Sequence, residues 1–393
     1  MEVSAPLLRR LRATFAAAAP GISPRAFFAP GRANLLGAHV DYNGGCVMPV
    51  ALSKGTYLLA GLRADGMLGV TSEQFPGQRV EIALADLRPR RAASWSAYAE
   101  GALWSAMEAW GRLPGLELAV SADLPMAKGL SSSASIECVV VRAVASLLGI
   151  EREADEYIRH AHAAETQYVG VRCGILDQTA IFLGREDAVL HFDCLELTRE
   201  HLPLDSRRAL VAIVDSGLAR GLATSAFNQR VAECTKALAI LQERLPGITC
   251  LRDVRHADFE SWADLLAPVL QRRVRHVIEE QQRTVRGAEA LRQGNLAEFG
   301  ALVSATHQSL RSLYEVSTPE LDALAAAAAD VPGCYGARLT GAGFGGCIVA
   351  LVHPDAQGEF SRRVPRAYRE TCGRETEVQW FTPAGGPREI LLP

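Results

Sequence analysis

The sequence predicts a two-domain protein of mixed α and β structure. Segments with the apolar spacing of strands alternate with helix-like segments up to residue 214, and residues 226–313 are predicted to be almost wholly helical. A chain of 393 residues suits two packed units. We find no internal repeat and no low-complexity linker, so we expect the units to pack tightly. The division is placed near residue 200, which gives units of residues 1–200 and 201–393.

The elements follow in order from local composition. The first 20 residues are expected to form a helical lead-in, and three further helices are expected before the long helical region. We predict helices over 94–110, 136–148 and 152–168 and strands over 45–60, 116–120, 188–192 and 209–214. The helical region 226–313 is interrupted near Pro246 and at the turn 293–295, and residues 335–352 are expected to form a strand, a turn, a helix and a strand.

Composition excludes several classes of partner. Lys and Arg number 41 and Asp and Glu 44, for a net charge of −3, which gives no reason to expect nucleic acid or an acidic membrane. Nine cysteines without a C-x-x-C pair indicate reduced thiols. The apolar run 138–148 is broken by Arg142 and is too short to span a bilayer. We therefore expect a soluble, cytoplasmic monomer that binds neither nucleic acid nor membrane.

The segment Leu124–Ser135 carries the strongest local signal. It reads Leu-Pro-Met-Ala-Lys-Gly-Leu-Ser-Ser-Ser-Ala-Ser and leads directly into an apolar helix. Backbone N–H groups at a helix start are unpaired and lie at the positive end of the dipole, so a turn of small residues there suits phosphate. The Gly-Lys-Ser/Thr of a P-loop is absent. A tight helix start with a purely structural role remains the alternative.

Two more glycine-rich segments accompany it. Residues 30–45 place Arg32, His39 and Asp41 between glycines, where Arg32 can meet phosphate oxygens and Asp41 can accept bonds from sugar hydroxyls. The alternative is an irregular surface turn in which His39 and Asp41 cap nearby backbone. Residues 341–346 match G-x-G-x-x-G, but no acidic residue follows in a βαβ context, so we exclude a nicotinamide site.

Taken in chain order, the segments 30–45, 124–135 and 341–346 resemble those of the GHMP small-molecule kinases, and specifically the galactokinase branch. Further stretches agree, namely 95–101, 173–178, 225–230 and 307–316, and the likeness runs from about residue 25 to the C-terminus. The resemblance implies an α+β fold in which an N-terminal ribosomal-protein-like domain meets a C-terminal ferredoxin-like domain, with the active site between them. It also implies that ATP with Mg²⁺ phosphorylates the anomeric C1 hydroxyl of a galactose-type sugar.

The resemblance assigns a role to each matching residue. Asp177 matches the catalytic aspartate that orients or deprotonates the sugar hydroxyl, and Arg32 would offset charge on the transferred group. Ser133 and Glu165 match magnesium ligands, although Glu165 on a helix also fits a solvated face. Trp95 would pack near adenine, or it is an ordinary core tryptophan. The phosphates would be held by Gly129, Leu130, Ser131, Ser132, Ser133 and Ala134, and the sugar by Ala38, His39, Asp41, Gly174 and Phe227.

Three positions depart from the galactokinase pattern. Ala38 stands where a glutamate usually contacts the sugar 6-hydroxyl, Phe227 stands where a sugar-contacting tyrosine is usual, and Lys128 lies in a less glycine-rich phosphate loop, where we expect it to face solvent. Each lost hydrogen bond is worth roughly 0.5–1.5 kcal/mol. We expect galactose as substrate. Galacturonate, whose carboxylate a pocket glutamate would repel, and the C6-lacking L-arabinose remain alternatives, as does a catalytically retired sugar and ATP sensor.

Overall fold

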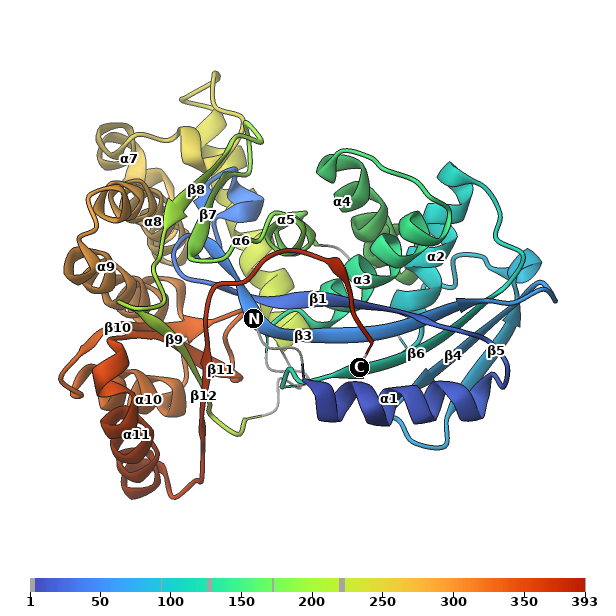
Figure 1. Ribbon diagram of the computed structural model, residues 1–393. Coiled ribbons are helices and arrows are strands. Elements are labelled where there is room, and N and C mark those ends of the chain that lie inside the picture. Colours follow the sequence, from blue (N-terminus) through green and yellow to red (C-terminus); the bar gives the residue numbers. More distant parts are fainter. Residues whose placement is uncertain (1–3, 93, 126–128, 172, 219–222, 393) are drawn as a thin grey trace.

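The computed structural model describes residues 4–92, 94–125, 129–171, 173–218 and 223–392 (Figure 1). Its helices are α1 (Ala5–Ala18), α2 (Ala97–Trp110), α3 (Ser132–Leu147), α4 (Ala154–Ala163), α5 (Leu176–Phe182), α6 (Ala223–Gln242), α7 (His256–Trp262), α8 (Pro268–Arg292), α9 (Leu296–Ser309), α10 (Pro319–Ala329) and α11 (Gln357–Cys372). Its strands are β1 (Arg25–Asn34), β2 (Cys46–Val47), β3 (Pro49–Leu62), β4 (Met67–Ser72), β5 (Arg79–Ala83), β6 (Leu116–Ala122), β7 (Ala188–Asp193), β8 (Arg199–Pro203), β9 (Leu210–Asp215), β10 (Cys334–Thr340), β11 (Cys347–Val352), β12 (Val378–Phe381) and β13 (Arg388–Ile390).

The largest sheet in the described ranges has the strand order β13-β1-β3-β6-β4-β5. Helices cover both of its faces, α1 on one side and α2, α3 and α4 on the other (Figure 1). Successive side chains of a strand point to opposite faces. Accordingly Phe27 and Ala29 pack toward α2 and α3, whereas Ala26 and Phe28 pack toward α1. Burial on both faces explains why β1 is apolar without alternation.

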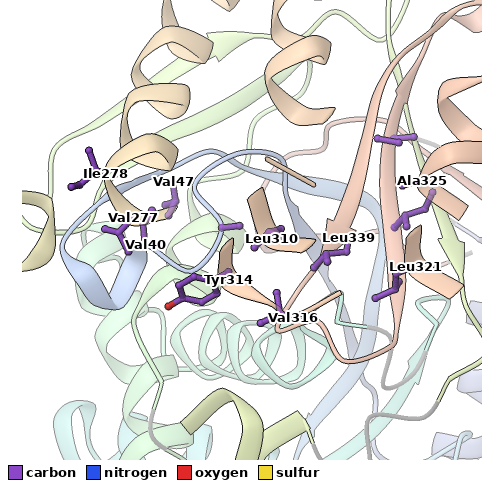
Figure 2. Packing of buried hydrophobic residues seen from close by; sticks show 14 of the residues in the cluster. Val40, Val47, Val277, Ile278, Leu310, Tyr314, Val316, Leu321, Ala325 and Leu339 are labelled. Carbon is purple, nitrogen blue, oxygen red and sulfur yellow. The ribbon is translucent and has the colours of Figure 1, made fainter. Parts of the chain in front are cut away.

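A second sheet, of order β10-β11-β9-β12, packs against α9 and α10. A small sheet, β2-β7-β8, lies against α8. One buried cluster combines Val40 and Val47, which precede β3, with Val277 of α8 and Leu339 of β10 (Figure 2). The segment that carries His39 and Asp41 is therefore packed directly against helices and strands from the second half of the chain.

Most of the predicted elements are confirmed, and one is wrong. The helices predicted over 94–110, 136–148 and 152–168 and the strands over 116–120, 188–192 and 209–214 are present with small shifts at their ends. No helix lies within 335–352, because β10 and β11 pair antiparallel and the glycine turn joins them directly. Gly341 and Gly343 adopt φ of 79° and 80°, which allows that reversal. The division near residue 200 stays a prediction, and β13, from the second half, pairs with β1.

No helix in the described part of the chain combines the length and the hydropathy needed to cross a bilayer.

Candidate active site

Arg32 and Asp177 form an ion pair at the centre of the candidate site. Arg32 follows an irregularity in the pairing of β1 with β3, and Asp177 lies in the first turn of α5. Nε and Nη2 of Arg32 donate to Asp177 Oδ1 at 2.9 and 2.7 Å, and Nη1 donates to the Gly129 carbonyl at 2.7 Å. The Asp177 side chain is 27% exposed, so it is held in place and still open to a ligand.

The serine turn closes around the same aspartate. Ser131 Oγ donates to Asp177 Oδ2, the oxygen that Arg32 leaves free. Ser131 precedes α3 and has φ of 56°, an uncommon value for a residue with a side chain. Residues with side chains that are held in this backbone region are often found at functional sites. The adjoining residues Met126–Lys128 lie outside the described part of the chain, and so does the expected orientation of Lys128.

The turn has two features that favour binding of an anion. Gly129 adopts φ of +78°, and α3 runs 16 residues from Ser132, so its dipole and the unpaired N–H groups of its first turn lie at the Asp177 end. Leu130 and Ala134 are buried and anchor the turn, whereas Ser132 and Ser133 are only partly buried. The residues predicted to hold the phosphates are thus gathered beside Asp177.

Ser133 and Glu165 meet next to this turn. Ser133 Oγ donates to Glu165 Oε1 at 3.4 Å. Glu165 lies in a π-helical turn, η3 (Ala164–Val169), that continues α4, a distortion often found at functional sites. Its side chain is buried, so the solvated-face alternative is wrong. Burial, followed by the charge of Asp177, raises the pKa of Glu165.

Gln178 links two buried carboxylates behind Ser133. Its Nε2 donates to Glu165 Oε2 and to Glu137 Oε2, both at 2.8 Å. Burial and the neighbouring Glu165 raise the pKa of Glu137 well above its usual value. Glu137 is a residue that the sequence reasoning missed. A signal was present, because a lone acidic residue inside the apolar run of α3 requires a polar partner.

Two of the residues predicted to contact sugar, Asp41 and Gly174, lie near Asp177. Asp41 opens the short helix η1 (Asp41–Asn43). Burial, followed by the charge of Asp177, raises the pKa of Asp41 to about 6. A Cβ added to Gly174 would lie 3.4 Å from Asp41 Oδ2, so the two residues are neighbours. Gly174 itself is exposed, so a ligand can reach this side of Asp41.

His39 and Phe227 form an aromatic wall with Tyr42 and Tyr314. The His39 ring centroid lies 5.8 Å from Phe227 and 4.8 Å from Tyr314. Nδ1 of His39 lies 2.9 Å from the Tyr42 hydroxyl, which is 2.7 Å from the Tyr314 hydroxyl. Burial lowers the pKa of His39 to about 3, so the imidazole is neutral at physiological pH. Ala38 is 5% exposed and belongs to the adjoining apolar cluster.

Trp95 lies apart from this group, before α2. It stacks on Phe75 with ring centroids 5.4 Å apart and planes 20° apart. The helix that follows it packs along α3. Trp95 is partly buried against the core cluster that α2 and α3 share, and its contact with adenine stays a prediction.

Comparison with known families and proteins agrees with this geometry. Residues 97–185 match the GHMP kinases N terminal domain, residues 288–370 the GHMP kinases C terminal domain, and residues 12–62 the galactokinase galactose-binding signature. The chain is 39% identical to a galactokinase of Roseiflexus sp. over 372 residues, covering 94% of each chain. It is 36% identical to a galactokinase of Bacillus subtilis over 369 residues, covering 93% of this chain and 94% of the relative.

Solved structures place the fold in the same group. A Lactococcus lactis galactokinase complexed with galactose superposes with a TM-score of 0.92 at 36% identity, covering 98% of this chain and all of that one. A mevalonate kinase superposes at 0.64 with 17% identity, which shows a shared fold only. The α+β fold with two GHMP kinase domains is thereby confirmed. Full-length relatives above 30% identity identify the chain as a member of the galactokinase family of GHMP kinases.

Proposed function

We propose that this ATP-dependent sugar kinase transfers the γ-phosphoryl group of ATP to the C1 hydroxyl of galactose, giving galactose 1-phosphate and ADP. The observation that carries the proposal is the position of Asp177. One of its oxygens is held by Arg32 from the sugar-side segment and the other by Ser131 from the phosphate turn. The carboxylate therefore links the segment proposed to bind the sugar with the turn proposed to bind the phosphates.

Asp177 is suited to receive the proton of the attacking hydroxyl. In the proposed step the C1 oxygen forms a bond to the γ-phosphorus, its proton passes to Asp177, and the bond from the γ-phosphorus to the bridging oxygen of ADP breaks. Arg32 lies within hydrogen-bond distance of Asp177 and next to the phosphate turn. It can offset negative charge on the transferred group while it keeps Asp177 oriented.

The residues beside the start of α3 are suited to hold ATP together with Mg²⁺. A hydroxyl and a carboxylate, Ser133 and Glu165, present hard oxygen donors beside the start of α3. Among the described residues no group of three or more His, Cys, Asp or Glu side chains is arranged to hold a metal alone. This donor set fits an ion that takes few protein ligands and completes its shell with phosphate oxygens and water. When bound, Mg²⁺ would neutralise phosphate charge.

Galactose is favoured over the alternatives. The curated relatives at 36–39% identity are galactokinases, and none of the observations at Ala38 or Phe227 favours galacturonate or L-arabinose in its place. A retired sensor is also not favoured, because Arg32 and Asp177 remain paired. We further propose that the protein works as a cytoplasmic monomer without nucleic acid or membrane partners.

The test is coupled ADP release with Mg-ATP across galactose, galacturonate, L-arabinose and N-acetylgalactosamine. We expect kcat/KM for galactose to exceed the others by at least tenfold. We expect Asp177→Asn to abolish turnover while it still binds ATP. Preference for another sugar would overturn the substrate, and turnover retained by Asp177→Asn would overturn the role of that residue.

A further inference from the structure

The short loop that follows β1, residues 35–38, is held through hydrogen bonds of its backbone N–H and C=O groups. Gly37 adopts φ of +81°, which turns its N–H and that of Ala38 toward the same point. Both donate to one oxygen of Glu280 in α8, at 2.8 and 2.9 Å. Two successive N–H groups that converge on an anion form a backbone nest. Here a side chain from the second half of the chain occupies the nest.

The second oxygen of Glu280 is also fully engaged. It accepts from Thr306 Oγ1 at 2.8 Å and from Arg283 Nε at 2.7 Å. The carboxylate has no exposed surface. Burial raises the pKa of Glu280, but Arg283, and then His276 and Arg338, outweigh burial and leave the pKa below its usual value. Glu280 is therefore an ionised, completely hydrogen-bonded anchor.

His276 holds the next peptide group of the loop, the one between Ala38 and His39. Its Nε2 lies 3.0 Å from the Ala38 carbonyl, and its Nδ1 lies 2.8 Å from Ser309 Oγ. Because the carbonyl can only accept, Nε2 carries the proton and Nδ1 accepts from the serine. Burial lowers the pKa of His276 to about 4, so the neutral ring persists at physiological pH. The N–H and the C=O of Ala38 are thus both bound by α8.

Other contacts bring the same loop onto the second half of the chain. Arg338 of β10 donates through Nη2 to the Asn34 carbonyl. Val40 packs with Val277 and Ile278 of α8 (Figure 2). The residues that follow directly, His39 and Asp41, are the ones that face the proposed sugar site. A rotation of the Gly37–Ala38 peptide would displace both of them, because the loop is too short to absorb it.

We propose that Glu280, supported by His276, is a positioning residue for the sugar site. It would set sugar affinity by fixing the peptide planes of Gly37 and Ala38, without touching the sugar. This inference rests on the proposed function, because that function makes His39 and Asp41 sugar contacts. Hydrogen bonds to a charged acceptor are stronger than those to a neutral one, so loss of the anion weakens both bonds that hold the loop.

The test compares Glu280→Gln with Glu279→Gln. Glu279 is the adjacent residue of α8, is partly exposed, and pairs with Arg283 at 3.4 Å. For Glu280→Gln we expect the KM for galactose to rise about tenfold, the KM for ATP to stay within twofold, and hydrogen exchange of residues 34–43 to become faster. For Glu279→Gln we expect neither change. His276→Leu removes one donor and is expected to raise the sugar KM less, with faster exchange in the same segment.

Each outcome decides the inference. Faster exchange of residues 34–43 with an unchanged sugar KM would overturn the positioning role, as would equal rises in the KM for sugar and for ATP. If Glu280→Gln does not fold, His276→Leu answers the same question. A wild-type protein that turns over no sugar would refute the proposed function and with it the effect on sugar affinity. Even then, comparing the amide hydrogen exchange of residues 34–43 in Glu280→Gln and in wild type, both without sugar, would decide whether Glu280 holds the loop.

Discussion

Replacing Asp41 by asparagine should make the ligand-free protein more stable at alkaline pH. Burial and the charge of Asp177 raise the pKa of Asp41 from 3.8 to about 6. A carboxyl whose pKa is higher in the folded state binds its proton more tightly when folded. The free energy of unfolding therefore falls as pH rises from about 4 to above 6, and this loss is complete at pH 8.

The size of the effect follows from the shift. A rise of about two pKa units lowers the free energy of unfolding at pH 8 by about 3 kcal/mol at most, relative to acidic pH. At pH 5 roughly half of this loss has occurred. Asp41→Asn removes the ionised form, so its stability relative to wild type should increase between pH 5 and pH 8 by up to about 1.5 kcal/mol. The same variant should bind sugar more weakly, because an acceptor of sugar hydroxyls is lost.

Urea unfolding at pH 5 and pH 8, followed by tryptophan fluorescence without ligand, measures this difference. Asp86→Asn serves as the control, since Asp86 is exposed on the short helix that follows β5. Its stability relative to wild type should not change between the two pH values. A stability difference for Asp41→Asn that does not grow between pH 5 and pH 8 would refute the reasoning.

Three further substitutions test separate parts of the site. Arg32→Lys removes the two-point contact with Asp177, and we expect kcat to fall by about 10- to 100-fold without loss of fold, measured as ADP release and by circular dichroism. Gly174→Ala places a methyl group 3.4 Å from Asp41 Oδ2, so the KM for sugar should rise while that for ATP stays constant in the same assay. Phe227→Tyr adds a hydroxyl beside His39, and a new hydrogen bond of about 0.5–1.5 kcal/mol should lower the galactose KM by about two- to tenfold. An unchanged galactose KM in Phe227→Tyr would mean that this ring does not face the sugar.

The sequence was most informative where function depends on residues that are close along the chain. Arg32, His39 and Asp41 share one segment and Gly129 to Ala134 another, so residue type and spacing pointed to the two segments, and the family resemblance assigned the individual residues. The spacing of apolar residues along the chain also located most helices and strands. The helix expected within 335–352 was wrong because the glycine turn permits a direct reversal, which leaves no room for a helix between the two strands.

Contacts between distant segments could not be predicted. Glu280 is one of many charged residues in α8, and only the fold shows that it meets Gly37, more than two hundred positions earlier. Ser131 was nominated for phosphate, but its bond to Asp177 depends on how α3 and α5 pack. Such pairings arise from tertiary packing, which local periodicity does not encode.

The pairing of β13 with β1 has a consequence for how the protein is made. During synthesis β1 emerges early, and its edge toward β13 stays uncovered until residues 388–390 have left the ribosome. An uncovered edge strand is a template for pairing with other chains. Residues 26–28 of β1 therefore lack their β13 partner while residues 29–387 are being made. A ribosome-bound chain that stops before residue 388 should be more prone to aggregation than one released after it, even when both contain the entire catalytic site.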